Sequence, residues 1–144
     1  MASPQTSALS DPDRLATLRA SGLLDSEPEE AFDRYTRLAA RLLDVPVAFV
    51  SLVAADRQFF KSQVGLPPAL REPRETPLSL SLCKHAVERR EPVRLGDLRE
   101  NSVPEASAVL DETGLGSFLG APLLAGDGTC LGSLSVMDEE PREW

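Results

Sequence analysis

Residues 116–138 read GSFLGAPLLAGDGTCLGSLSVMD, two apolar runs on either side of Asp127-Gly128. An Asp-Gly pair between apolar runs supplies the two positive-φ positions of a type I′ turn, so the stretch predicts a β-hairpin. Both predicted strands are rich in Gly and Ser as well as Leu, Val and Phe. Small residues on one face of a sheet leave room for another group to lie against it. The hairpin therefore predicts an antiparallel sheet with a recess on one face.

The earlier part of the chain supplies further strands. Residues 47–54 (VAFVSLVA) are apolar on both faces and predict a strand near the middle of a sheet. Residues 58–64 predict a second strand, in which Phe60 shares a face with Ser62. Four prolines lie in residues 65–77, which predicts a surface loop. Residues 92–95 predict a short strand, and its proline indicates either an edge strand or the first position of a strand.

Helices are predicted between and before these strands. Asp11-Pro12 begins a first helix, with Gly22 as its left-handed stop. Ser26 and Glu29 have the spacing of a capping box that starts a second helix. Its apolar stripe has helical period and consists of Phe32, Tyr35, Leu38, Ala39, Leu42 and Leu43. Two shorter helices are expected from Ser79 or Ser81 to about Arg90, and from Ser102-Pro104 to Gly114. The fold class is thus α+β.

Composition limits the possible functions. The chain has 144 residues, 42% of them hydrophobic, and a formal net charge of -8. This length predicts a single domain, and the acidic balance argues against nucleic acid or an anionic membrane as partner. The first residues lack the basic and apolar segments of a signal peptide. The two cysteines, Cys83 and Cys130, form no CxxC pair, which favours free thiols in the reducing cytoplasm.

Four stretches in this order resemble the GAF domain family of small sensory modules. They are residues 14–53, 56–66 (DRQFFKSQVGL), 79–97 (SLSLCKHAVERREPVRLGD) and 116–142. The combination is similar to GAF modules of bacterial histidine kinases, diguanylate cyclases and phosphatases. The resemblance implies a GAF-like central antiparallel sheet of five to six strands with helices on both faces. It also implies a ligand pocket on one face, beneath shorter helices and loops.

Domain boundaries follow from the same comparison. We expect a flexible N-terminus over residues 1–10 and one GAF-like domain over residues 11–144. Members of the family usually continue into a long helix beyond the equivalent of Pro141-Arg142-Glu143-Trp144, where this chain stops. Without that helix, apolar surface on the N-terminal helices would be exposed and covered by a partner. We therefore expect a homodimer, attached to an output domain or associated with a partner signalling protein.

Candidate ligand-binding residues come from the predicted pocket face and its cover. They are Phe60, Leu82, Cys83, His85, Asp97, Phe118, Ser133 and Ser135. The two phenylalanines could equally be core or pocket wall. Ser133 and Ser135, predicted on one face with Leu131 and Met137, could bind a ligand or simply let a helix approach. An acid at the place of Asp97 closes the pocket in similar modules, but it could also be a turn residue bonding its own backbone.

Cys83 and His85 could each have a functional or a purely structural role. His85 is the only histidine, and it could be a functional switch or a structural residue on a helix flank. Bilin-carrying relatives attach their chromophore through a cysteine directly before a histidine, whereas Lys84 intervenes here. Cys83 could line the pocket or simply pack, as free cysteines do. No metal site or cofactor is expected, because no ligand cluster appears in the sequence.

Three functions compete. The first is a non-catalytic sensor that binds an unknown small molecule in the recess and relays the signal through dimerisation. The second is a structural or dimerisation module whose recess is filled by its own side chains. The third is a redox enzyme or sensor like the GAF-fold methionine sulfoxide reductases, or a bilin- or haem-binding photosensor. Reactive thiols require an accessible, electropositive setting, so we expect no enzyme.

Overall fold

A computed structural model describes residues 8–100 and 103–144. All six strands form one antiparallel sheet in the order β3-β2-β1-β6-β5-β4. The strands are β1 (Val47–Val53), β2 (Arg57–Val64), β3 (Glu75–Pro77), β4 (Val93–Leu95), β5 (Ser117–Leu124) and β6 (Cys130–Asp138). This confirms the α+β class and the single sheet joining the C-terminal hairpin to the strands before residue 65. No described helix is long and apolar enough to cross a bilayer.

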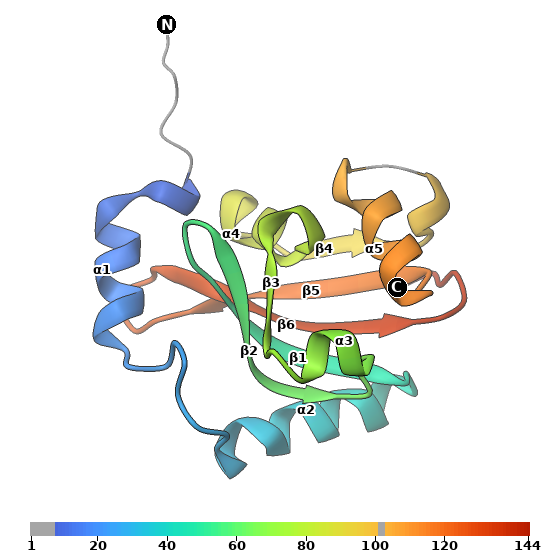
Figure 1. Ribbon diagram of the computed structural model, residues 1–144, viewed down its shortest axis with the longest axis horizontal. Helices are drawn as coiled ribbons and strands as arrows, with labels where there is room; N and C mark the ends of the chain where they lie inside the picture. Colours follow the sequence, from blue (N-terminus) through green and yellow to red (C-terminus); the bar gives the residue numbers. More distant parts are fainter. Residues whose placement is uncertain (1–7, 101–102) are drawn as a thin grey trace, which may run out of the picture.

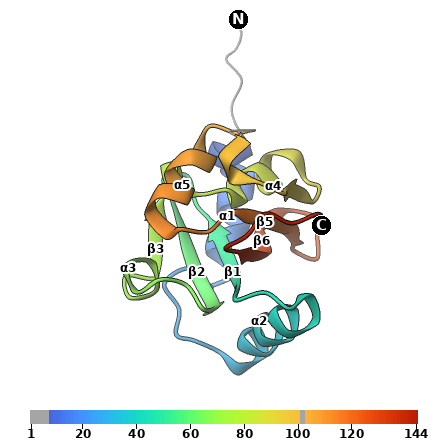
Figure 2. The ribbon, with the colours of Figure 1, turned by 90° about the vertical axis from the view of Figure 1, so that its right-hand side faces the viewer.

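The sheet lies between two layers of helices, as Figure 2 shows from the side. Helices α4 (Cys83–Arg89) and α5 (Glu105–Thr113) cover one face, which we call the α4 face. Helix α2 (Glu30–Leu43) covers the other, the α2 face, and α1 (Pro12–Ala20) packs at the end of the sheet (Figure 1). Shorter elements complete the chain: η1 (Ala8–Ser10), α3 (Pro68–Arg71), η2 (Leu78–Leu80) and η3 (Leu98–Glu100).

The hairpin exists, but its turn differs from the prediction. Only Gly128 of the Asp127-Gly128 pair has a positive φ, of 89°. The Gly128 N–H donates to the carbonyl of Ala125 (2.9 Å), and the Ala125 N–H donates to that of Thr129 (2.8 Å). The loop is therefore a three-residue turn closed by a left-handed glycine, the next commonest hairpin after the two-residue type.

Two register shifts decide which side chains share a face. Val50 pairs with Ser62 but Ser51 pairs with Phe60, so Lys61 is an extra residue in β2. Consequently Phe60 faces α4 whereas Ser62 faces α2, and the predicted shared face is wrong. A second shift lies near Leu131, between the pairs Leu123–Gly132 and Leu124–Cys130. Leu131 packs with the α1 cluster and not with Met137. Period-two reasoning fails wherever a bulge adds a residue.

Two local predictions need correction. Helix α2 starts at Glu30 without a side-chain cap, so the predicted capping box does not form. Ser26 instead donates to the carbonyl of Leu23 and accepts from the ammonium of Lys61, each at 2.6 Å. The proline-rich loop of residues 65–77 contains α3 and the edge strand β3. The helix after Ser81, the edge strand β4 and the stop of α5 at Gly114 are confirmed.

The N-terminal segment is fastened by one buried arginine. The guanidinium of Arg14, 5% exposed, donates to the carbonyls of Ala8, Leu9, Val53 and Cys130 at 2.7–3.3 Å. Burial lowers the pKa of Arg14 from its usual value, but the four acceptors replace the lost hydration. Of the predicted frayed residues 1–10, the first seven lie outside the described residues, and Ala8–Ser10 form η1.

Candidate functional site

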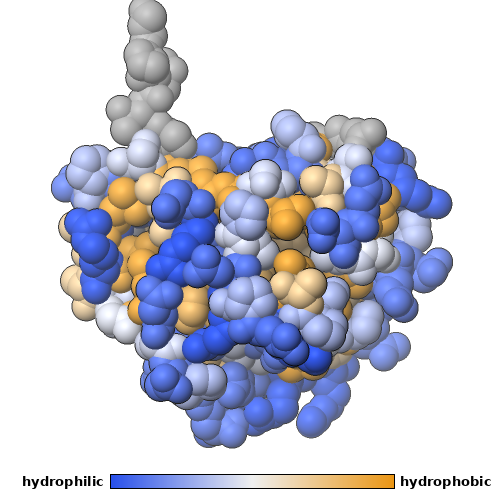
Figure 3. Space-filling view, viewed as in Figure 1, coloured by the Kyte–Doolittle hydropathy of each residue, from blue (hydrophilic) through white to orange (hydrophobic). Residues whose placement is uncertain are grey.

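The recess predicted from the hairpin is a cavity on the α4 face, bounded by α5, η2 and α3. Its wall is largely apolar and includes Phe49, Phe60, Phe118, Leu82 and Cys83. The free volume is about 20 Å³, and one water molecule needs about 10–15 Å³ of such volume. The cavity therefore has room for about one water, because side chains of the protein fill it. Figure 3 shows apolar residues near the centre of this view, surrounded by hydrophilic ones.

Three of the residues that line the cavity are phenylalanines. Phe49 and Phe60 meet edge to face, with ring centroids 5.3 Å apart. Phe118 is fully buried, and a Cβ on Gly120 would lie 2.7 Å from the tip of its ring. Gly120 has no room for a side chain, because the Phe118 ring occupies that space. At Gly132 a Cβ would lie 1.9 Å from the carbonyl oxygen of Ser51. The space beside these two glycines is therefore occupied by atoms of the protein itself and not left for a ligand.

Ser133 and Ser135 lie outside the cavity lining, beneath α4. Their hydroxyls bond each other, and that of Ser135 lies 3.5 Å from the sulfur of Cys83. All three side chains are buried. Burial raises the pKa of Cys83, and hydrogen bonds from the two serines offset only part of that rise. These serines thus let α4 approach β6, and the Cys83 thiol stays protonated at neutral pH.

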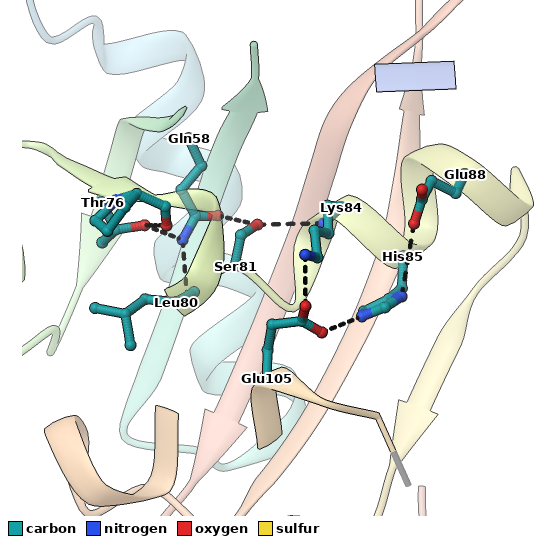
Figure 4. A network of polar contacts seen from close by, with 9 residues as sticks. Gln58, Thr76, Leu80, Ser81, Lys84, His85, Glu88 and Glu105 are labelled. Carbon is teal, nitrogen blue, oxygen red and sulfur yellow. Dashed lines mark hydrogen bonds and ion pairs between the residues drawn. The ribbon is translucent and has the colours of Figure 1, made fainter. Parts of the chain in front are cut away.

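His85 is not among the residues that line the cavity; it joins α4 to the start of α5 (Figure 4). Its Nε2 lies 2.6 Å from one carboxylate oxygen of Glu105, and the ammonium of Lys84 lies 2.5 Å from the other. Glu88 approaches Nδ1 at 3.8 Å. Burial acts to raise the pKa of Glu105, but the hydrogen bonds from Lys84 and His85 hold it below its usual value. We call Lys84, His85 and Glu105 the Glu105 clamp.

Asp97 is a turn residue that bonds nearby backbone and does not close the cavity. Its carboxylate accepts from the Arg99 backbone N–H at 3.0 Å and from the Arg99 guanidinium at 2.8 and 2.9 Å. These bonds lower the pKa of Asp97. The residue lines a separate shallow hollow with Gly96 and Arg142. Of the eight candidate residues, Phe60, Leu82, Cys83 and Phe118 reach the cavity, whereas His85, Asp97, Ser133 and Ser135 do not.

Gln58 is a polar wall residue that sequence reasoning missed. Its side chain is buried, donates to the Thr76 hydroxyl at 2.9 Å and accepts from Ser81 at 3.0 Å. The Ser81 hydroxyl also accepts from the backbone N–H of Lys84 at 3.2 Å, which connects this bridge to the start of α4 (Figure 4). Gln58 lies two residues before Phe60, so strand alternation was the signal that could have found it.

The chemical groups of a redox, metal or cofactor site can be checked against this geometry. Cys83 and Cys130 are both free and buried, and burial raises the pKa of Cys130 as well. Among the described residues, no group of three or more His, Cys, Asp or Glu side chains is placed to hold a metal ion. The cavity wall consists mainly of hydrocarbon, which can exclude water but offers few groups for proton transfer.

Comparison with known proteins fits this architecture. Residues 27–144 match the GAF domain. The chain belongs to the GAF domain family. It is 30% identical over 130 residues to the cyclic di-GMP phosphodiesterase PA2567 of Pseudomonas aeruginosa, covering 90% of this chain and 21% of that protein. The chain thus spans about a fifth of the curated relative that it matches.

Solved structures share this GAF fold. The GAF domain of a phosphoenolpyruvate-protein phosphotransferase from Coxiella burnetii has a TM-score of 0.65 at 18% identity, covering 96% of this chain and 83% of that one. The free methionine-R-sulfoxide reductase from Neisseria meningitidis has a TM-score of 0.61 at 16% identity, covering 100% and 82%. A fold shared by the GAF domain of a phosphotransferase and by a reductase does not assign a function. The chain is a GAF sensory or regulatory module by family.

Proposed function

We propose that this GAF domain is a non-catalytic regulatory module that acts as a homodimer through helix α2. The observation that carries the proposal is an apolar seam on that helix. Ala31, Tyr35, Leu38 and Leu42 are spaced by four, three and four residues, the a/d spacing of a coiled coil. Tyr35 is 61% exposed, Leu38 47% and Leu42 73%. We call these four residues the α2 seam.

The seam is separate from the face by which α2 packs on the sheet. Thr36 is fully buried, and Ala39 and Ala40 pack against the sheet residues Ala48 and Val136. The predicted single apolar stripe is therefore divided between two faces of one helix. One face covers the sheet, and the other leaves large apolar side chains in water, which is uncommon for a surface with no partner.

A second copy of the chain is the occupant that fits the seam. The first turn of α2 is acidic, with Glu30 and Asp33, whereas Arg34, Arg37 and Arg41 follow. If two α2 helices pair antiparallel, the basic end of each lies beside the acidic end of the other. A two-fold axis then repeats every contact, as in most homodimers. Charge complementarity thus favours pairing of two copies, with their α2 helices antiparallel and not parallel.

The cavity makes a smaller contribution to this proposal. Because about 20 Å³ is free, a ligand of ordinary size has no room in the state described, since ligand sites usually measure about 300–1,000 Å³. One observation keeps ligand binding as a second candidate. Glu105, at the start of α5, bonds Lys84 and His85 of α4, so releasing this clamp would free α5 to move from the cavity.

The absence of catalysis is part of the proposal. It is supported by the buried, protonated thiols and by the engagement of His85 with Glu105. We further propose that the module works in the cytoplasm, where thiols stay reduced. By analogy with its much longer relative, it would regulate an output domain or a partner signalling protein.

Sedimentation equilibrium tests the proposal directly. The wild-type chain is expected to be dimeric at micromolar concentration, whereas Leu38→Glu and Leu42→Glu variants are expected to be monomeric. Leu124→Glu is the matched control, because Leu124 is 54% exposed but lies on β5. A wild-type monomer, or equal loss of dimer in the Leu124 variant, would contradict the proposal.

A further inference from the structure

A further hollow lies at the β2 edge of the domain, between the start of α2, strand β2 and helix α3. Its volume is about 430 Å³, far larger than that of the cavity on the α4 face. Four cationic side chains and one acidic side chain contribute to its lining, namely Arg37, Lys61, Arg71, Arg74 and Asp33. We call it the arginine cleft. A concentration of cations is unexpected in a chain whose formal net charge is -8.

Arg74 is the central residue of the cleft. Its backbone has a φ of 60°, a left-handed conformation that costs a residue with a side chain about 1–2 kcal/mol. Its guanidinium donates to the carbonyl of Ser26 at 2.9 Å and lies 4.7 Å from the centre of the Phe59 ring. The other terminal nitrogen, Nη2, is buried and has no hydrogen-bond partner among the described residues.

That unpaired nitrogen requires an explanation. A buried donor without an acceptor costs about 1–3 kcal/mol, and more when the group is charged. Native proteins therefore leave few such atoms, and each one suggests a missing water, ion or ligand. Nη2 is closed to solvent in the described state; because Arg74 lines the cleft, a small shift of its side chain would let an acceptor in the cleft satisfy it.

Two further guanidinium groups line the cleft, and they differ in their partners. Arg71, at the end of α3, is exposed and makes no ion pair with a described residue. Arg37 of α2 lines the other side and is paired with Glu30 on the exposed face of its own helix. An anion in the cleft would thus be reached from α3, from the turn before β3 and from α2.

The other charged groups of the lining are already engaged. The ammonium of Lys61 is fully buried and bonds Glu29, Ser26 and the carbonyl of Glu27, so it is structural. Asp33 accepts from the Ser62 hydroxyl at 2.5 Å. The negative charge of Asp33 repels an anion. We therefore expect an anion to bind at the side of the cleft near Arg71 and Arg74.

We propose that the arginine cleft binds the phosphoryl group of a small ligand. Guanidinium groups match phosphate oxygens with paired hydrogen bonds, and they remain charged at every physiological pH. The volume of the cleft exceeds that of a phosphate alone, so the group can belong to a larger molecule. The site is distinct from the cavity on the α4 face, and it touches α2 without using the α2 seam.

Calorimetric titration with inorganic phosphate and with inorganic pyrophosphate tests the site, at constant ionic strength set by sodium chloride. The wild-type chain is expected to bind at least one of them saturably. Arg71→Gln, whose side chain is exposed and makes no ion pair with a described residue, is expected to weaken binding at least about tenfold. Arg74→Gln should weaken it further, with circular dichroism to establish that this variant folds.

Arg94→Gln is the matched control, since Arg94 is an exposed arginine of β4 outside the cleft. It should leave the affinity unchanged. Equal losses in the Arg71 and Arg94 variants would show non-specific attraction and overturn the proposal. Absence of saturable binding of either anion below about 10 mM would overturn it as well. Neither result depends on whether the chain dimerises, so the two proposals fail separately.

Discussion

The carboxylate of Glu105 lies 2.6 Å from Nε2 of His85. This contact joins α5 to α4 on the outside of the domain, while both helices contribute side chains to the cavity beneath them. Lys84 bonds the second oxygen of the same carboxylate at 2.5 Å. The one histidine of the chain thus holds the cover of the cavity in place, although it does not line the cavity.

Replacing Glu105 by glutamine is expected to lower the free energy of unfolding by about 1–2 kcal/mol at pH 7, because charge-assisted hydrogen bonds contribute about this much. Glutamine keeps the shape and loses the charge. Urea denaturation would measure the change. The control is Glu112→Gln at the other end of α5, which should change stability by less than about 0.5 kcal/mol.

The clamp also predicts a direction for the pH dependence. The folded-state pKa of Glu105 is lowered, so its stabilisation is complete above the unfolded-state pKa, at about 4.3, and is lost as pH falls through the folded-state pKa. The difference in stability between wild type and Glu105→Gln should therefore shrink as the pH falls below about 4.5. A difference that grows over this acidic range would contradict the assignment.

Adding one methyl group at Gly120 should destabilise the fold by about 1–3 kcal/mol, as overpacking of a core does. The Cβ of Gly120→Ala would lie 2.7 Å from the Phe118 ring and 3.0 Å from the Ser135 hydroxyl. Gly126→Ala is the control, since a Cβ there meets nothing within 4 Å. Thermal denaturation of both variants would compare them. A stable Gly120→Ala protein would mean that the recess is looser than described.

Loss of the Arg14 side chain should be more costly. Arg14→Ala leaves the carbonyls of Val53 and Cys130 without their donor in a buried position, and we expect a loss of about 2–4 kcal/mol. Hydrogen exchange should show earlier opening of α1 and of the ends of β1 and β6. Arg19→Ala is the matched control, because Arg19 is an exposed arginine of the same helix. This substitution should change the free energy of unfolding little.

Thiol reactivity checks the non-catalytic proposal. Cys83 and Cys130 are buried and their pKa values are raised by that burial, so a neutral-pH titration with a disulfide reagent should label neither in the native state. Both should react in denaturant. Rapid labelling of either native thiol would favour a redox role.

Sequence reasoning was most successful where a pattern is local. The strand at residues 47–53, the stop of α5 at Gly114 and the hairpin strands follow from periodicity and turn residues. It failed where a tertiary contact decides the outcome. Ser26 has the spacing of a helix cap, yet the buried Lys61 takes its hydroxyl. The extra residue at Lys61 also reversed the face of Ser62, and nothing in the local pattern marks that bulge.

The site was less predictable than the fold for the same reason. Gly120 and Ser135 are small residues on a strand face, which suggested space for a ligand. The structure uses that space for Phe118 and for the approach of Cys83. Tyr35 and Leu38 were predicted to belong to one apolar stripe that packs on the core. The stripe is wider than the buried face of the helix, so part of it lies in the core and part on the surface. Such a division depends on how far the helix rotates on the sheet, which only the packing determines.

Native mass spectrometry of the purified chain tests the central claim most directly, because it reports the number of subunits and any bound small molecule together. The account predicts a species of twice the 15.6 kDa chain mass, with no added mass from a molecule enclosed on the α4 face. Leu38→Glu should convert it to the single-chain mass. A wild-type monomer that carries a tightly bound small molecule, retained when Arg71 and Arg74 are replaced, would contradict it.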